Sequence, residues 1–109
     1  MKKINYQINL SNEAESDFAN SYAFYKSESQ AIADKFIKSI DQSFRKIAFS
    51  PYSYNKVFKS LRRHLVKKFP FVIYYYIDEY NIKIVAIFHT SRNPEIWNNR
   101  LNSKGSKLI

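Results

Sequence analysis

A chain of 109 residues has room for one domain, and 45% hydrophobic and 17% aromatic residues are enough for a core without disulfides or metals. The absence of cysteine excludes disulfides and every redox or metal site built on thiolates. The formal net charge of +9 indicates an anionic partner, a nucleic acid or an acidic protein. The sequence shows neither a signal-peptide core nor an apolar run of about 18 residues, so we predict a soluble, cytoplasmic protein that does not enter a membrane.

The first half of the chain predicts one strand and two helices. Residues 4–10 alternate between apolar and polar side chains, which is typical of a half-buried strand. Apolar residues at helical spacing then predict a helix that begins at an Asn12 cap and runs to about Lys26. A second helix is predicted after a Ser27 cap, and Ser50-Pro51 ends it because proline disfavours helical geometry in the residue before it. Its predicted inner face consists of Ile32, Ala33, Phe36, Ile37, Ile40, Phe44 and Ile47.

The second half predicts three antiparallel strands and a short helix. Residues 51–59 form a turn-like connector, after which Leu61–Phe69 is a basic strand. Phe71–Ile77 is apolar or aromatic throughout, as expected for a strand covered on both faces, and Ile82–Thr90 is the last strand. Asn93-Pro94 starts the final helix. The prediction is a single α+β domain over residues 1–101, of order β-α-α-β-β-β-α with a helix hairpin on a mainly antiparallel sheet, and a flexible tail at 102–109.

Several kinds of chemistry are excluded by the motifs that the chain lacks. Its one glycine, Gly105, leaves no phosphate-binding loop, and there is no Gly-x-Ser-x-Gly elbow. His64 and His89 show no ligand spacing with carboxylates, so we expect neither a metal site nor a cofactor.

What remains is a set of basic residues that could bind phosphates or carboxylates, helped by aromatic side chains that could stack on bases. The set comprises Arg62, Arg63, Lys67, Lys68, His89, Arg92 and Arg100. Two interpretations stay open for it. The cations could bind a partner, or they could solvate an exposed sheet edge while His89 serves as a structural hydrogen-bonding residue. Trp97 is most simply a core residue of the last helix.

The order and spacing of several short motifs resemble toxins of the RelE/ParE superfamily from type II toxin–antitoxin modules. These motifs are Ala14-x-x-Asp17, Tyr25, Ser50-Pro51, Leu61-Arg62, the segment 68–75 and His89-x-x-Arg92-x-Pro94-x-x-Trp97-x-x-Arg100. The resemblance covers residues 4–101 and implies the fold predicted above, together with an acidic antitoxin that neutralises the basic toxin. It also implies one of two targets: mRNA on the ribosome, cleaved by RelE-like members, or DNA gyrase, inhibited by ParE-like members.

Carried over by position, the RelE-like activity would use Arg63 or Arg62 to neutralise the scissile phosphate, His89 as general acid and Arg92 to stabilise developing charge. The chain departs from that pattern, since no glutamate lies near the end of the second helix and no tyrosine follows His89. Its ending is closer to the ParE-like and plasmid-stabilisation branch, which favours gyrase inhibition. In that reading the binding residues are Arg62, Lys67, Lys68, Arg92, Trp97 and Arg100. A non-catalytic nucleic-acid-binding domain is the third alternative.

Overall fold

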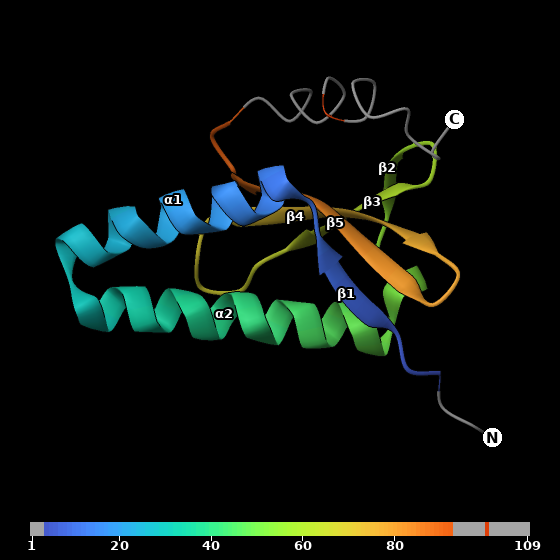
Figure 1. The fold of residues 1–109 in the computed structure, drawn as a ribbon, viewed down its shortest axis with the longest axis horizontal. Helices are drawn as coiled ribbons and strands as arrows, with labels where there is room; N and C mark the ends of the chain where they lie inside the picture. Colours follow the sequence, from blue (N-terminus) through green and yellow to red (C-terminus); the bar gives the residue numbers. More distant parts are fainter. Residues whose placement is uncertain (1–3, 93–99, 101–109) are drawn as a thin grey trace.

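The computed structural model describes residues 4–92 and Arg100 (Figure 1). Its elements are β1 (Gln7–Leu10), α1 (Asn12–Glu28), α2 (Gln30–Phe49), a 3-10 turn η1 (Pro51–Ser53), β2 (Lys56–Phe58), β3 (Leu61–Leu65), β4 (Phe71–Asp78) and β5 (Asn81–His89). The predicted C-terminal helix and the tail at 102–109 lie outside the described residues, Arg100 aside. No described helix is both long and apolar enough to cross a bilayer.

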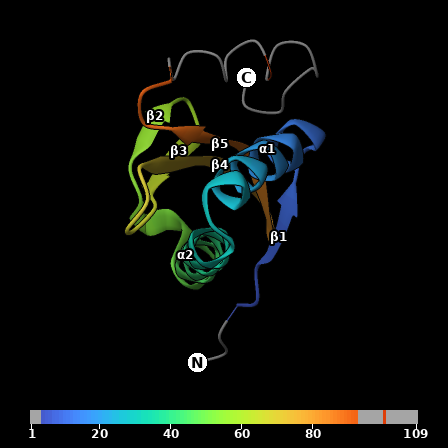
Figure 2. The same ribbon diagram turned by 90° about the vertical axis from the view of Figure 1, so that its left-hand side faces the viewer.

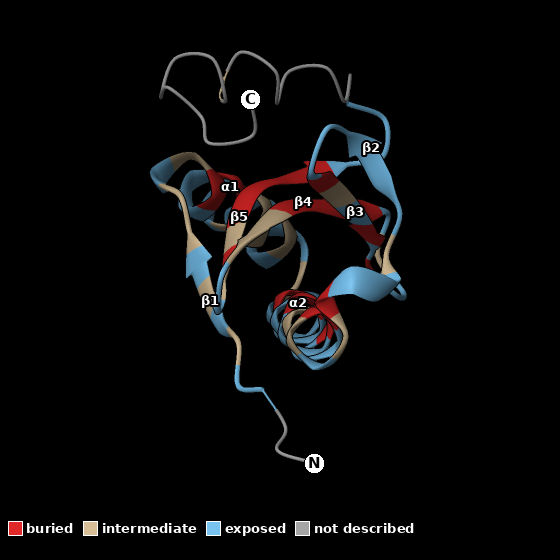
Figure 3. Ribbon diagram, turned by 90° about the vertical axis from the view of Figure 1, so that its right-hand side faces the viewer, coloured by how far each residue is buried: buried red, intermediate tan, exposed pale blue. Residues whose placement is uncertain are grey.

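The five strands form one sheet in the order β1-β5-β4-β3-β2, with β1 parallel to β5 and the other pairs antiparallel. The two helices form a hairpin on one side of this sheet (Figures 1 and 2). β4 is the central strand, and all five residues from Phe71 to Tyr75 are buried (Figure 3). The predicted α+β architecture is therefore confirmed, as is the two-sided cover of the apolar strand.

The sheet has one strand more than predicted, because the connector at 51–59 was expected to be turn-like throughout. It contains η1 and then β2, which forms a hairpin with β3. All three residues of β2 are exposed. A strand that buries neither face shows no alternation of apolar and polar residues, so the sequence pattern could not reveal it.

The predicted helix caps are wrong by one or two residues. Ser11, not Asn12, caps α1, and its Oγ accepts a hydrogen bond from the N–H three residues on (3.1 Å). Ser29, not Ser27, caps α2 in the same way (3.3 Å). The N–H of Ser29 also donates to the carbonyl of Tyr25 at the end of α1 (2.9 Å). One serine therefore ends the first helix and starts the second, which makes the hairpin connection very short.

The predicted inner face of α2 is correct except at two positions, Ile32 and Ile37. Phe36, Ile40 and Ile47 are buried against the sheet, whereas Ile32 and Ile37 are each 40% exposed. The stripe that faces the sheet is narrower than the apolar stripe in the sequence.

Two apolar clusters lie on opposite faces of the sheet. The helix-side cluster contains Phe36, Ile73 and Tyr75, and the far-side cluster contains Tyr74 and Phe88. Successive side chains of a strand point to opposite faces. A residue paired with a member of the helix-side cluster therefore lies on the helix side of the sheet, and one paired with a member of the far-side cluster lies on the far side.

Within residues 4–92, three turns contain a non-glycine residue with positive φ. These residues are Lys59 (49°), Lys68 (74°) and Glu79 (55°). Lys59 lies between β2 and β3, Lys68 between β3 and β4, and Glu79 between β4 and β5.

Candidate functional site

The cationic residues predicted as one site occupy three separate places. Arg63 stands opposite Tyr74 in the β3–β4 ladder and so lies on the far side of the sheet from the helices. His89 stands opposite Phe71, with ring centroids 5.4 Å apart, and so lies on the helix side. The sheet itself separates these two side chains.

His89 lies in a pocket between the end of β5 and helix α1. Its Nδ1 accepts a hydrogen bond from the backbone N–H of Ser91 (3.1 Å) and lies 2.8 Å from the Ser91 hydroxyl. With Nδ1 occupied as acceptor, the neutral ring carries its proton on Nε2. The pocket is lined by Asn20, Ser21, Phe24, Tyr25, Phe71, His89 and Ser91. Burial raises the pKa of the Tyr25 hydroxyl. His89 is thus oriented by a neighbour, but no described arginine lines its pocket.

Arg100 and Arg92 bind a buried carboxylate of the same chain. Asp17, whose side chain is 7% exposed, accepts two hydrogen bonds from Arg100, at 2.7 and 2.9 Å. Arg92 lies 3.7 Å from the same carboxylate. Both guanidinium groups also stack over Phe88, at 4.2 Å for Arg92 and 4.8 Å for Arg100. Neither cation is therefore a freely presented charge.

Asp17 and Arg100 bind backbone groups of β5 beyond the point where β1 ends. β1 pairs with β5 only as far as Leu10 and Ile84. Past that point, the backbone N–H of Ile87 donates to Asp17 (3.0 Å) and Arg100 donates to the carbonyl of Val85 (3.1 Å). These side chains satisfy backbone groups that a sixth strand would otherwise pair.

Sequence reasoning missed this role, because an acid near a helix start is usually explained by the helix dipole. The signal that could have found it is spacing. Asp17 lies three residues after the buried Ala14 and one before the partly buried Phe18, so it belongs to the apolar stripe of α1.

Arg62 holds the connector in place, whereas its neighbour Arg63 faces solvent. The guanidinium of Arg62 donates to the carbonyls of Tyr52 (3.2 Å) and Tyr54 (2.6 Å) and lies 5.2 Å from the Tyr52 ring centroid. Arg63 is exposed. Of the two arginines proposed for phosphate binding, only Arg63 is available to a partner.

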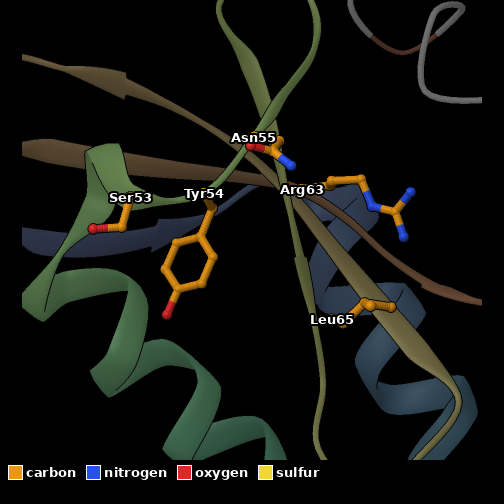
Figure 4. A pocket seen from close by; sticks show the side chains of 5 residues that line it. All are labelled: Ser53, Tyr54, Asn55, Arg63 and Leu65. Atoms are coloured by element: carbon orange, nitrogen blue, oxygen red, sulfur yellow. The ribbon is translucent and has the colours of Figure 1, made fainter.

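Two adjoining pockets share Ser53 and Tyr54. We call the first the edge pocket; it is lined by Ser53, Tyr54, Asn55, Arg63 and Leu65 (Figure 4). In this view the Tyr54 ring points toward α2 and Arg63 extends away from it. The second, the helix-end pocket, is lined by Arg45, Lys46, Phe49, Ser50, Ser53 and Tyr54. Cations and exposed apolar groups thus lie side by side, with no acidic residue in either lining.

Beneath Tyr54 lies His64, the one described histidine that is buried. Its ring packs edge-on against the Tyr54 ring, with centroids 4.6 Å apart, and its Nδ1 has no hydrogen-bond partner in the part of the chain that the structure describes. Burial, followed by the nearby charge of Lys46, lowers the pKa of His64 to about 4. His64 is therefore neutral at physiological pH.

The remaining predicted residues are less constrained. Lys67 and Lys68 are exposed in the loop between β3 and β4. Trp97 lies outside the described residues. In the described part of the chain, no three His, Asp or Glu side chains gather as a metal site would require.

Comparison with known proteins places this geometry in a family. Residues 8–94 match the family model described as the ParE toxin of the type II toxin–antitoxin system parDE. A solved structure titled "Chromosomal ParDE TA system from P. aeruginosa" is similar in fold, with a TM-score of 0.66 and 14% identity, over 78% of this chain and 96% of that one. No curated protein matches. On the extent of the family match, the chain belongs to the ParE toxin family of type II toxin–antitoxin systems.

Proposed function

We propose that this protein is a cytoplasmic toxin that arrests growth by binding DNA gyrase, and that an acidic antitoxin neutralises it. Membership of the ParE toxin family supports the toxin role and an antitoxin partner. The net charge of +9 favours an acidic neutralising protein, since opposite charges steer association and suppress wrong partners.

The observation that favours binding over RNA cleavage is the separation of His89 from Arg63 by the sheet. A phosphoryl-transfer centre needs its acid and its charge-stabilising group on the same phosphate, within about 3 Å of the reacting atoms. Here the acid candidate lies on the helix side and the arginine on the far side. A third candidate, Arg92, already contacts Asp17. Because His89, Arg63 and Arg92 do not meet at one place, they are better suited to binding a partner than to catalysis.

A RelE-like endoribonuclease is the second candidate, and one observation favours it. The hydrogen bond from the backbone N–H of Ser91 holds the His89 ring in one orientation, and a positioned side chain is the first requirement for proton transfer. His89 is exposed, so its Nε2 could reach a phosphate without a change in fold. In the nucleic-acid-binding alternative, the exposed cations Arg63, Lys67 and Lys68 would contact phosphates. This alternative predicts an affinity for DNA or RNA that falls steeply as the salt concentration rises.

The deciding experiment measures both activities with purified toxin. DNA supercoiling by gyrase and cleavage of ribosome-bound mRNA are assayed with the wild type, His89→Ala and Lys38→Ala, the last a matched change at an exposed cation of α2 outside all the pockets named above. We expect inhibition of supercoiling by all three proteins and no ribosome-dependent cleavage. Cleavage that is lost only in His89→Ala, with gyrase unaffected, would reverse the assignment.

Induced expression separates the toxin from the nucleic-acid-binding domain. We expect expression to stop growth, and co-expression of a short acidic protein from the neighbouring reading frame to restore it and to co-purify with this chain. Harmless expression without such a partner, together with salt-sensitive binding to DNA or RNA, would favour the nucleic-acid-binding domain instead.

A further inference from the structure

Among the described residues, none pairs with the outer edge of β3 beyond the end of β2. β2 pairs only with Leu61 and Arg62, and one further bond runs from the N–H of Arg63 to the carbonyl of Asn55 (3.0 Å). Because backbone groups alternate sides along a strand, the N–H and carbonyl of Leu65 point to the same outer side as the N–H of Arg63. The next N–H, that of Val66, confirms the alternation, since it points inward to the carbonyl of Phe71 (2.9 Å).

The edge pocket lies along this open edge of β3. Its lining joins Arg63 and Leu65 on β3 with Tyr54 and Asn55 before β2 (Figure 4). The side chain of Leu65 is apolar, yet the residue is 60% exposed. An exposed apolar residue beside unpaired backbone groups is the usual template for an added strand.

The side chains around the open edge of β3 indicate which kind of peptide segment could pair with it. On the far side of the sheet, an added strand would meet Arg63 and Leu65. On the helix side it would meet the Tyr54 ring and, beyond it, Lys46 and Phe49 of the helix-end pocket. Each side thus offers at least one cation and one apolar group, so a matching strand carries both an acidic and an apolar residue on each of its faces. Because neighbouring residues of a strand point to opposite faces, that pattern is two acidic residues followed by two apolar ones. The outer edge of β1 carries no cation within Gln7–Leu10.

We propose that the open edge of β3 at Arg63–Leu65 receives an extended acidic segment of the antitoxin as an added strand. This inference rests on the proposed function for the identity of the partner. Three residues of β3 span roughly 10 Å, so the added strand contributes only two or three backbone hydrogen bonds, and other antitoxin contacts supply the rest of the affinity.

The test uses the full chain and a defined probe, a terminally blocked octapeptide in which pairs of glutamate alternate with pairs of valine, so that each face of the extended peptide carries both residues. Amide hydrogen exchange is followed by NMR on isotope-labelled protein with millimolar peptide. We expect exchange of the Leu65 N–H to slow at least about tenfold on saturation, with the amides of β1 unchanged. Matched control peptides carry lysine in place of glutamate, or an N-methyl group on every residue, which blocks both hydrogen-bonding edges of the peptide, and neither should bind.

Two variants at one position separate the backbone from the side chain. Leu65→Pro removes the outward N–H and leaves the β3–β4 ladder intact, as proline at an edge position allows. It should weaken peptide binding by roughly tenfold, whereas Leu65→Ala, which keeps the N–H, should change it less than about threefold.

The proposal is overturned by unchanged exchange at Leu65, by protection at β1 instead, or by equal binding of the N-methylated peptide. The last outcome decides the matter even if Leu65→Pro does not fold. Concentration-dependent dimers in sedimentation that disappear in Leu65→Pro would assign the edge to a second copy of the chain and also overturn it. None of these measurements involves growth arrest or gyrase, so failure here is distinguishable from failure of the proposed function.

Discussion

Replacement of Asp17 by asparagine should destabilise the protein more than any surface change of charge. The Asp17 carboxylate is 7% exposed and binds Arg100, whose side chain is only 14% exposed. Asparagine keeps the shape but leaves the Arg100 guanidinium without its counter-charge in a mostly buried position. Loss of one partner from a buried pair typically costs 3–5 kcal/mol, and we take about 3 kcal/mol because Arg100 keeps some solvent and the carbonyl of Val85.

That free energy translates into a measurable shift in melting temperature. With an unfolding entropy of about 2.1 cal/mol/K per residue, a domain of this size loses roughly 4 °C for each kcal/mol. Asp17→Asn should therefore melt about 13 °C below the wild type, measured by circular dichroism or differential scanning calorimetry at neutral pH.

A second ion pair supplies the matched control. Asp41 and Arg45 form an i,i+4 pair on α2 at 2.9 Å, with side chains 56% and 81% exposed. Asp41→Asn should lower the melting temperature by no more than about 2 °C, because exposed helical pairs contribute roughly 0.3–0.5 kcal/mol. In the double variant Asp17→Asn with Arg100→Gln, part of the loss should return, since the mostly buried charge of Arg100 is removed and Arg92, which also loses its counter-charge, is 41% exposed. Equal melting temperatures for Asp17→Asn and Asp41→Asn would refute the assignment of Asp17 as a structural anchor.

Two further predictions concern the connector and the histidine beneath it. Because the pKa of His64 is about 4 in the fold and near 6.5 when unfolded, the unfolded chain binds more protons between these values. The free energy of unfolding that neutral His64 contributes is fully present above pH 6.5 and is lost as the pH falls toward 4, by up to about 3 kcal/mol. Denaturant titrations of the wild type and of His64→Phe should show this loss only in the wild type. Arg62→Ala should cost about 1–2 kcal/mol by releasing the connector carbonyls, whereas Arg63→Ala should leave the melting temperature within about 2 °C and weaken partner binding. Equal destabilisation by both changes would show that Arg63 also holds the fold.

The central sheet could be predicted from sequence because burial on both faces leaves an unmistakable pattern. β4 is apolar at nearly every position, and the turn at Glu79 is bounded by two runs of β-forming residues. The β2 strand could not be predicted, because it is held by its hairpin with β3 and not by burial. Cap positions failed for a different reason, since several serines and asparagines near each helix start could serve, and only the backbone geometry selects one.

The candidate site was harder to predict than the fold. Sequence alternation places Arg62 and Arg63 on opposite faces of β3, but it cannot tell that the connector returns to cover one of them. The pairing of Arg100 with Asp17 joins residues 83 positions apart, beyond the reach of any local pattern. Long-range pairings of this kind decide which charges remain for a partner.

The turns beside β3 indicate a trade-off between thermal stability and charge. Lys59 and Lys68 both have positive φ, a backbone geometry that costs a residue with a side chain about 1–2 kcal/mol and glycine almost nothing. Glycine at both positions would make the protein harder to melt, yet it would lower the net charge by two beside the strand that carries Arg63. Lysine at these two turns therefore lowers the stability of the fold but places ammonium groups near both ends of β3. There they add to the positive potential that an acidic partner meets on approach.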